Sequence, residues 1–146
     1  MSQSFIVVAL DGSGHSLEAL SAARDLAKAM GRELHGLYVY PWTQEASVIF
    51  KRESRGSGAE LHQTRDQSAG EVFDEAELAL GASGVLVKRH VLLGEPAEEI
   101  LAFLQANPGA HLVMGRRGLS KIKSLLMGSV SDKVTRHAAG LVTVVG

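Results

Sequence analysis

The sequence contains no cysteine. This absence excludes a disulfide framework, a catalytic thiol and a thiolate zinc site. A chain without cysteine is compatible with a reducing cytosol, and we expect the protein to be cytoplasmic. Long apolar runs are also absent, because no segment approaches the roughly eighteen continuous apolar residues of a membrane span. We therefore expect neither a membrane-spanning nor a membrane-targeting segment, and no membrane partner.

A strong net charge is lacking as well, since the formal net charge is -1. The cations are nevertheless concentrated in one segment. Residues 115–137 have a net charge of +5, and the rest of the chain has a net charge of -6. A local cluster of this kind favours an anion site over the extended basic face that duplex binding needs, so we expect no nucleic-acid partner. With 146 residues, 45% of them hydrophobic, the chain is long enough for one domain with a substantial core.

Short apolar runs alternate with helical patterns along the chain. FIVVAL, residues 5–10, is typical of a strand buried on both faces and is followed by the turn-forming DGSG. Apolar residues recur every three or four positions from 15 to 30, before Gly31, which predicts an amphipathic helix. The strand at 33–40 is expected to stop at Pro41, whose ring removes a hydrogen-bond donor.

The same patterns predict the remaining elements. Strands are expected at 85–93, 111–114 and 141–145, and helices at about 60–80, 95–107 and 129–137, with a polar segment at 43–60. This alternation predicts a single α/β domain over residues 1–146, with a Rossmann-like, open, parallel five-stranded sheet and helices on both faces. In the strand order 3-2-1-4-5, a crevice opens where strands 1 and 4 end, which places Asp11 opposite Gly115.

The stretch MGRRGLSKIKSLLMGS, residues 114–129, has the features of a phosphate cradle. Gly115 and Gly118 follow a strand and allow backbone N–H groups to approach an anion closely. Gly128 and Ser129 open a helix whose N-terminus favours negative charge. The residues alone also fit a surface loop that ends in a helix cap. Neither a Walker A motif nor the dinucleotide fingerprint after the first strand is present.

The residues resemble the universal stress protein family. The resemblance lies in FIVVALDGSGHSLEAL, VLLGEPAEEIL and HLVMGRRGLSKIKSLLMGSVSDKVTRHAAGLVTVV, and it covers nearly the whole chain except about 43–70. In the nucleotide-binding branch of that family, the motif is Gly, two residues, Gly, nine residues, Gly and then Ser or Thr. Gly115, Gly118, Gly128 and Ser129 match this spacing without a gap.

The resemblance implies an ATP-binding protein, with Mg²⁺ or Mn²⁺ accompanying the phosphates. It places the adenine and ribose near the ends of the first two strands. It places the phosphates at the glycine loop, which begins at Gly115, and at the start of the next helix, Ser129 to Ser131. The implied nucleotide-binding residues are Ala9, Asp11, Val39, Met114, Gly115, Arg116, Arg117, Gly118, Ser120, Lys121, Gly128, Ser129, Val130 and Ser131.

Several residues have a second, simpler interpretation. Asp11 also fits an Asx-turn or a cap of the following helix. Lys123, Lys133 and Arg136 are better explained as a solvated face. The six histidines show no i, i+4 pair with a partnering acid, so we expect no histidine-based metal site. The segment 43–60 fits either a lid over the crevice or a long excursion.

The leading hypothesis is a small ATP-binding regulatory module of the stress response, whose nucleotide occupancy changes its conformation or its partners. No general base is evident, so we expect at most slow ATP hydrolysis or phosphoryl transfer. The alternative is a nucleotide-free module for dimerisation and interaction. Leu92 and Leu93, where a phospho-acceptor Asp would stand, exclude a receiver domain. We also expect a homodimer through the C-terminal strand, Leu141 to Val145, because its apolar edge would otherwise be unpaired.

Overall fold

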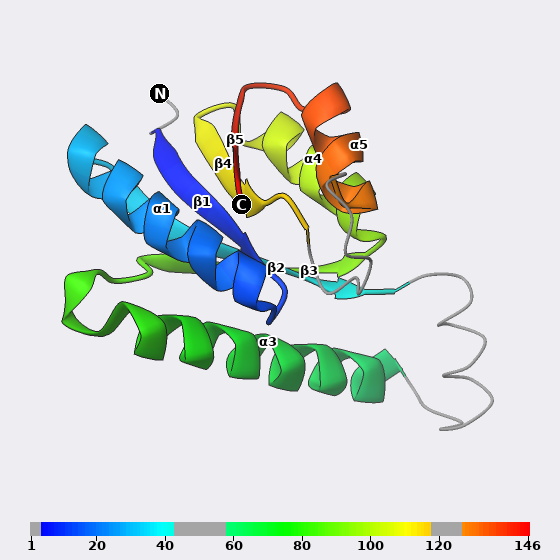
Figure 1. Ribbon diagram of the computed structural model, residues 1–146. Helices are drawn as coiled ribbons and strands as arrows, with labels where there is room; N and C mark the ends of the chain where they lie inside the picture. Colours follow the sequence, from blue (N-terminus) through cyan, green and yellow to red (C-terminus); the bar gives the residue numbers. More distant parts are fainter. Residues whose placement is uncertain (1–3, 43–57, 118–126) are drawn as a thin grey trace.

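The computed structural model describes residues 4–42, 58–117 and 127–146 (Figure 1). The chain forms β1 (Phe5–Leu10), α1 (Gly14–Met30), β2 (Glu33–Pro41), α3 (Gly58–Leu80), a 3-10 turn η1 (Gly81–Ser83), β3 (Lys88–Gly94), α4 (Pro96–Ala106), β4 (Ala110–Gly115), α5 (Ser129–His137) and β5 (Leu141–Val145). Most of the predicted polar segment 43–60 lies outside the described residues. Within the described ranges, no helix has the length and apolar character that a bilayer crossing requires.

The strands form one parallel sheet in the order β3-β2-β1-β4-β5, as the alternation of elements predicted. From β1 the chain first moves toward β3 and later returns to place β4 on the other side of β1. All five carboxyl ends therefore lie at one edge, and the neighbouring connections after β1 and β4 diverge there. A crevice at this point is the expected consequence of the topology.

Helices cover both faces of the sheet (Figure 1). α1 and α3 pack on one face, where Ile6 and Val8 of β1 contact a cluster that includes Phe73. α4 and α5 pack on the other face, where Val7 joins Ile100 and Val134. Alternate residues of β1 are thus buried on opposite faces, which confirms the prediction of a strand buried on both sides and explains its continuous apolar sequence.

Two strand boundaries differ from the prediction. β3 begins at Lys88, not at residue 85, and Val85 and Val87 are exposed although they belong to an apolar run. Pairing decides this boundary, because the ladder with β2 begins where Lys88 meets His35. The apolar run therefore begins before the strand, at residue 85, whereas β3 begins at Lys88.

β2 includes Pro41, although the strand was expected to stop before this residue. The N–H of Trp42 donates to the carbonyl of Gly94 in β3. Since successive N–H groups of a strand point to opposite sides, the nitrogen of Pro41 faces the side of β1. The pairing with β1 has already ended at Tyr38, so no hydrogen bond is lost at Pro41.

Candidate functional site

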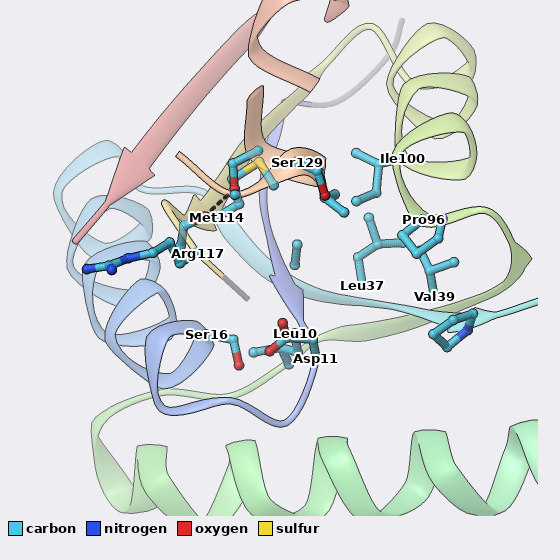
Figure 2. Close-up of a pocket in the computed structure, with 16 residues that line it drawn as sticks. Leu10, Asp11, Ser16, Leu37, Val39, Pro96, Ile100, Met114, Arg117 and Ser129 are labelled. Carbon is cyan, nitrogen blue, oxygen red and sulfur yellow. Dashed lines mark hydrogen bonds between the residues drawn. The ribbon is translucent and has the colours of Figure 1, made fainter. Parts of the chain in front are cut away.

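A cavity of about 280 Å³ lies at the carboxyl ends of β1 and β4, at the predicted crevice (Figure 2). Its walls come from the ends of β1, β2 and β4, from the N-terminal parts of α1, α4 and α5, and from Asp11 and Arg117, which follow β1 and β4. The lining residues are Ala9, Leu10, Asp11, Ser16, Leu37, Val39, Pro41, Pro96, Ile100, Met114, Gly115, Arg117, Gly128, Ser129, Val130 and Ser131. Segments distant in the sequence therefore meet at one site.

Asp11 stands directly after β1 and shapes the turn into α1. Its Oδ1 atom accepts a hydrogen bond of 2.9 Å from the N–H of Ser13, which is an Asx-turn. Gly12 has φ +84°, a left-handed conformation that suits glycine. The helix cap itself is Ser13, whose Oγ accepts from the N–H of Ser16 at 3.1 Å. Asp11 thus has a structural role, as one interpretation predicted, and it also lines the cavity.

One wall of the cavity is apolar. Leu37, Val39 and Pro41 alternate along β2 and therefore point to the same face of the sheet. Pro96 and Ile100 of α4 lie opposite them (Figure 2). The carboxylate of Glu95 caps α4 by accepting from the N–H of Glu98 at 2.9 Å, and Pro96 occupies the first helical position. Local capping thus fixes where this wall begins.

Another wall is the N-terminus of α5, which starts without a side-chain cap. Gly128 is the N-cap residue and has no side chain to accept a hydrogen bond from the first turn. The first N–H groups of any α-helix lack intrahelical acceptors, and they carry the positive end of the helix dipole. Here they belong to Ser129, Val130 and Ser131, all of which line the cavity. This wall is therefore suited to an anion.

Backbone hydrogen bonds hold together the two ends of the glycine loop. The N–H of Gly128 donates to the carbonyl of Arg116 at 2.8 Å, and the N–H of Arg116 donates to the carbonyl of Val145 in β5, also at 2.8 Å. A Cβ atom at Gly115 would lie 3.1 Å from the carbonyl oxygen of His15. Close packing against α1 therefore explains this glycine, in addition to the anion approach that the sequence suggested.

The structure brings most of the predicted nucleotide-binding residues to this cavity. Ten of them line it: Ala9, Asp11, Val39, Met114, Gly115, Arg117, Gly128, Ser129, Val130 and Ser131. Arg116 does not, and its Cβ lies 3.7 Å from the position that a Cβ of Gly146 would occupy. Gly118, Ser120 and Lys121 lie outside the described residues.

Sequence reasoning missed the apolar lining residues Leu10, Leu37, Pro41, Pro96 and Ile100, and also Ser16. A signal was available for part of this set. Once Val39 is placed at the crevice, alternation along β2 adds the residues two positions before and after it. The α4 residues carry no such signal, because an apolar stripe does not tell which part of a helix borders an opening.

Two cations of α5 form surface ion pairs. Nε of Arg136 lies 3.0 Å from Oδ1 of Asp132, and Nζ of Lys133 lies 3.7 Å from Oε1 of Glu98. The solvated-face interpretation is thus confirmed for these two residues, while Lys123 lies outside the described residues. No cluster of three or more His, Asp or Glu side chains suited to a metal ion occurs in 4–42, 58–117 and 127–146.

Solved structures with the same fold include universal stress proteins that hold adenine nucleotides. A universal stress protein in complex with cAMP superposes with a TM-score of 0.71 and 23% identity, covering 100% of this chain and 99% of the other. The universal stress protein from Archaeoglobus fulgidus in complex with dAMP gives a TM-score of 0.67 and 21% identity, covering 100% of both chains. At these identities the likeness establishes the shared fold.

The sequence comparisons extend this likeness from fold to family. A universal stress protein of Bacillus subtilis is 30% identical over 145 residues, which covers 96% of this chain and 97% of that protein. The family model described as "Universal stress protein family" matches residues 5–146, so it includes every strand of the sheet and the whole candidate site. The chain therefore belongs to the universal stress protein family.

Proposed function

We propose that this protein binds ATP in the cavity at the carboxyl ends of β1 and β4, and that nucleotide occupancy regulates its conformation or its partners in a stress response. The observation that carries the proposal is the composition of the cavity walls. An apolar slot suited to a flat base shares the cavity with an uncapped helix N-terminus suited to phosphate. Two family members of the same fold, in complex with cAMP and with dAMP, support an adenine nucleotide as the ligand.

The described residues fit the parts of ATP in turn. The adenine ring packs between Leu37 and Val39 of β2 and Ile100 of α4, where its apolar faces leave water. The Asp11 carboxylate has one oxygen committed to its Asx-turn, and its other oxygen accepts from a ribose hydroxyl or from the adenine amino group. The phosphates lie at the first turn of α5, where N–H groups and the Ser129 hydroxyl donate to them.

A divalent cation, Mg²⁺ or Mn²⁺, accompanies the phosphates in this proposal. The described residues offer it no cluster of carboxylates or imidazoles, so it is held chiefly by phosphate oxygens and water. In the described part of the cavity, Asp11 is the one carboxylate, and its turn already uses one oxygen. A site of this kind suits binding better than rapid hydrolysis, so we propose at most a slow ATPase or phosphotransferase activity.

Gly128→Val tests the proposal at the wall where phosphate is expected. A branched side chain at the helix N-cap obstructs the approach of an anion to the first turn, so the affinity for ATP should fall by about tenfold or more. The matched control is Gly70→Val in α3, where a Cβ meets nothing within 4 Å. Calorimetric titration with ATP, ADP, AMP and GTP measures the change. Equal ATP affinity in both variants and the wild type would remove the α5 N-terminus from the site.

We also propose a homodimer through β5 (Leu141–Val145). β5 pairs with β4 on one side and is an edge of the described sheet, and the Leu141 side chain is 61% exposed. An apolar edge strand of this kind offers free backbone groups to a second copy. This observation also favours the alternative function, a dimerisation and interaction module that needs no nucleotide. Sedimentation at micromolar concentration tests the dimer, and a monomer there would contradict it.

A further inference from the structure

The two serines of the first turn of α5 have different surroundings. Ser129 is exposed and borders the cavity. Ser131 is 3% exposed, and its Oγ donates a hydrogen bond of 2.7 Å to the carbonyl oxygen of Gly115, drawn dashed in Figure 2. A serine has a single hydroxyl hydrogen. The Ser131 hydroxyl therefore cannot donate to a phosphate while this bond exists.

The acceptor of this bond has a fixed position. Gly115 is the last residue of β4 and pairs with Val145 of β5. It also packs closely against the start of α1, since a Cβ there would lie 3.1 Å from the carbonyl oxygen of His15. Gly115 is held in place by the sheet and by α1. The hydrogen bond from Ser131 therefore ties the first turn of α5 to the end of β4. The bond between Gly128 and Arg116 adds a second link at the same place.

We infer that Ser131 is a positioning residue of the nucleotide site, which acts through Gly115, beside Ser129, whose hydroxyl the proposed function already places at the phosphates. The inference rests on the proposed binding of ATP. Ser131 has two effects in this arrangement. It holds the first-turn N–H groups of α5 beside the end of β4, and it occupies a carbonyl oxygen whose partial negative charge would otherwise face an anion.

Loss of the Ser131 hydroxyl should weaken the binding of phosphate more than the binding of the nucleoside. In Ser131→Ala the Gly115 carbonyl loses its donor, and the first turn of α5 loses its link to β4. We expect the ratio of ATP affinity to adenosine affinity to fall by about tenfold, the effect of one such hydrogen bond. Ser131→Thr keeps the hydroxyl and should restore the ratio. A purely structural role would lower both affinities alike or neither.

Measurements on the ligand-free protein separate positioning from contact. Amide hydrogen exchange at Gly128 and Asp132, whose N–H groups donate to the carbonyls of Arg116 and Gly128, should be faster in Ser131→Ala than in the wild type, because the start of α5 is less firmly held. Ser129→Ala should leave this exchange unchanged and still lower the ATP to adenosine ratio. Both alanine variants should thus lower the ratio of ATP affinity to adenosine affinity, but only Ser131→Ala should speed amide exchange in the ligand-free protein.

Calorimetric titration of the wild type and the three variants with ATP and adenosine, together with this exchange measurement, decides the inference. The expected result is a lower ratio in both alanine variants, faster exchange in Ser131→Ala alone, and a normal ratio in Ser131→Thr. A wild type that binds no adenine nucleotide would overturn both the proposed function and this inference. A wild type that binds ATP, with a normal ratio in Ser131→Ala, would overturn this inference alone.

Discussion

At the carboxyl end of the sheet, N–H groups without intrahelical acceptors line an open cavity, whereas at the amino ends of β2 and β3 polar side chains are hydrogen-bonded to one another. The first turn of α5 begins without a side-chain cap beside the cavity. At the opposite end, Nδ1 of His35 lies 3.0 Å from Nε2 of His90, and Nε2 of His35 lies 3.1 Å from Oε1 of Glu33. One sheet therefore presents an end suited to a ligand and, at the amino ends of β2 and β3, polar side chains that are hydrogen-bonded to one another.

Aromatic rings complete the histidine pair at the amino end. Phe5 stacks on His35 with 4.1 Å between ring centroids, and Phe103 of α4 meets His90 edge-on at 4.8 Å. A carboxylate can only accept a hydrogen bond, so His35 carries a hydrogen on Nε2, and a neutral His35 then accepts at Nδ1 from His90. A hollow of about 380 Å³ adjoins this cluster, but Glu33 and His35, which line it, are bonded to each other. The two hollows therefore differ in their linings, because Glu33 and His35 are hydrogen-bonded to each other, whereas the first N–H groups of α5 have no intrahelical acceptor.

The largest expected effect is a loss of stability when the aromatic packing at the amino end of the sheet is removed. Phe103→Ala removes a ring that is 9% exposed and packs on both His90 and Phe5. The free energy of unfolding should fall by about 3 kcal/mol, measured by urea denaturation. Leu78→Ala is the control, because that side chain is 83% exposed and its loss should cost under about 0.5 kcal/mol. ATP affinity of folded Phe103→Ala should stay within about twofold of the wild type if the two ends are independent.

The second effect is a pH dependence that belongs to the amino end. Burial lowers the pKa of His90 to about 4, and His35 and Lys88 add repulsion. An unfolded histidine has a pKa near 6.5, so between about pH 6.5 and pH 4 the unfolded chain binds a proton that folded His90 does not. The free energy of unfolding should therefore fall as the pH falls through this window, by on the order of 1–2 kcal/mol from pH 7.5 to pH 5.

Urea denaturation of the wild type and of His90→Gln at the two pH values tests this expectation. Glutamine keeps a hydrogen-bonding partner for His35 and does not titrate, so the variant should lose stability less steeply on acidification. Glu33 and Lys88 are the other charged groups beside the pair, and both are unchanged in the variant. An equally steep loss in both proteins would assign the pH dependence to other groups.

The third effect separates the two roles of Asp11 at the carboxyl end. Asp11→Ala removes both the acceptor of the Asx-turn and the carboxylate that faces the cavity, and ATP affinity should fall by about tenfold. Asp11→Asn retains an acceptor for the turn, so it isolates the carboxylate charge. Asp25→Ala, whose side chain is 70% exposed, is the remote control. Normal ATP affinity in both Asp11 variants would restrict this residue to the turn.

The smallest effect is expected at the surface of α5. Arg136→Ala breaks an ion pair with Asp132 in which the arginine side chain is 70% exposed. Solvent screens such a pair, so the change in the free energy of unfolding should stay below about 0.5 kcal/mol. ATP affinity should be unchanged, because Arg136 does not line the cavity. A large loss of affinity would show that the cationic face of α5 contributes to binding at a distance.

The sequence predicted the carboxyl end far better than the amino end. β1 and the turn after it are local features, and the spacing of Gly115, Gly128 and Ser129 matches a family motif, so the site was placed where the cavity lies. The histidine pair depends on the register of β2 and β3, in which His35 lies opposite Lys88 and His90 opposite Leu37. Register is set by tertiary pairing and has no local signature, so histidines 55 positions apart could not be paired beforehand.

The most direct test of the central claim maps amide chemical shifts while ATP is added to the protein. The account predicts saturable shifts at Asp11, Gly115 and Ser129, with the amides of His35 and His90 nearly unchanged. Shifts concentrated at the amino end, or none at millimolar ATP, would contradict the assignment of the nucleotide to the cavity at the carboxyl ends of β1 and β4.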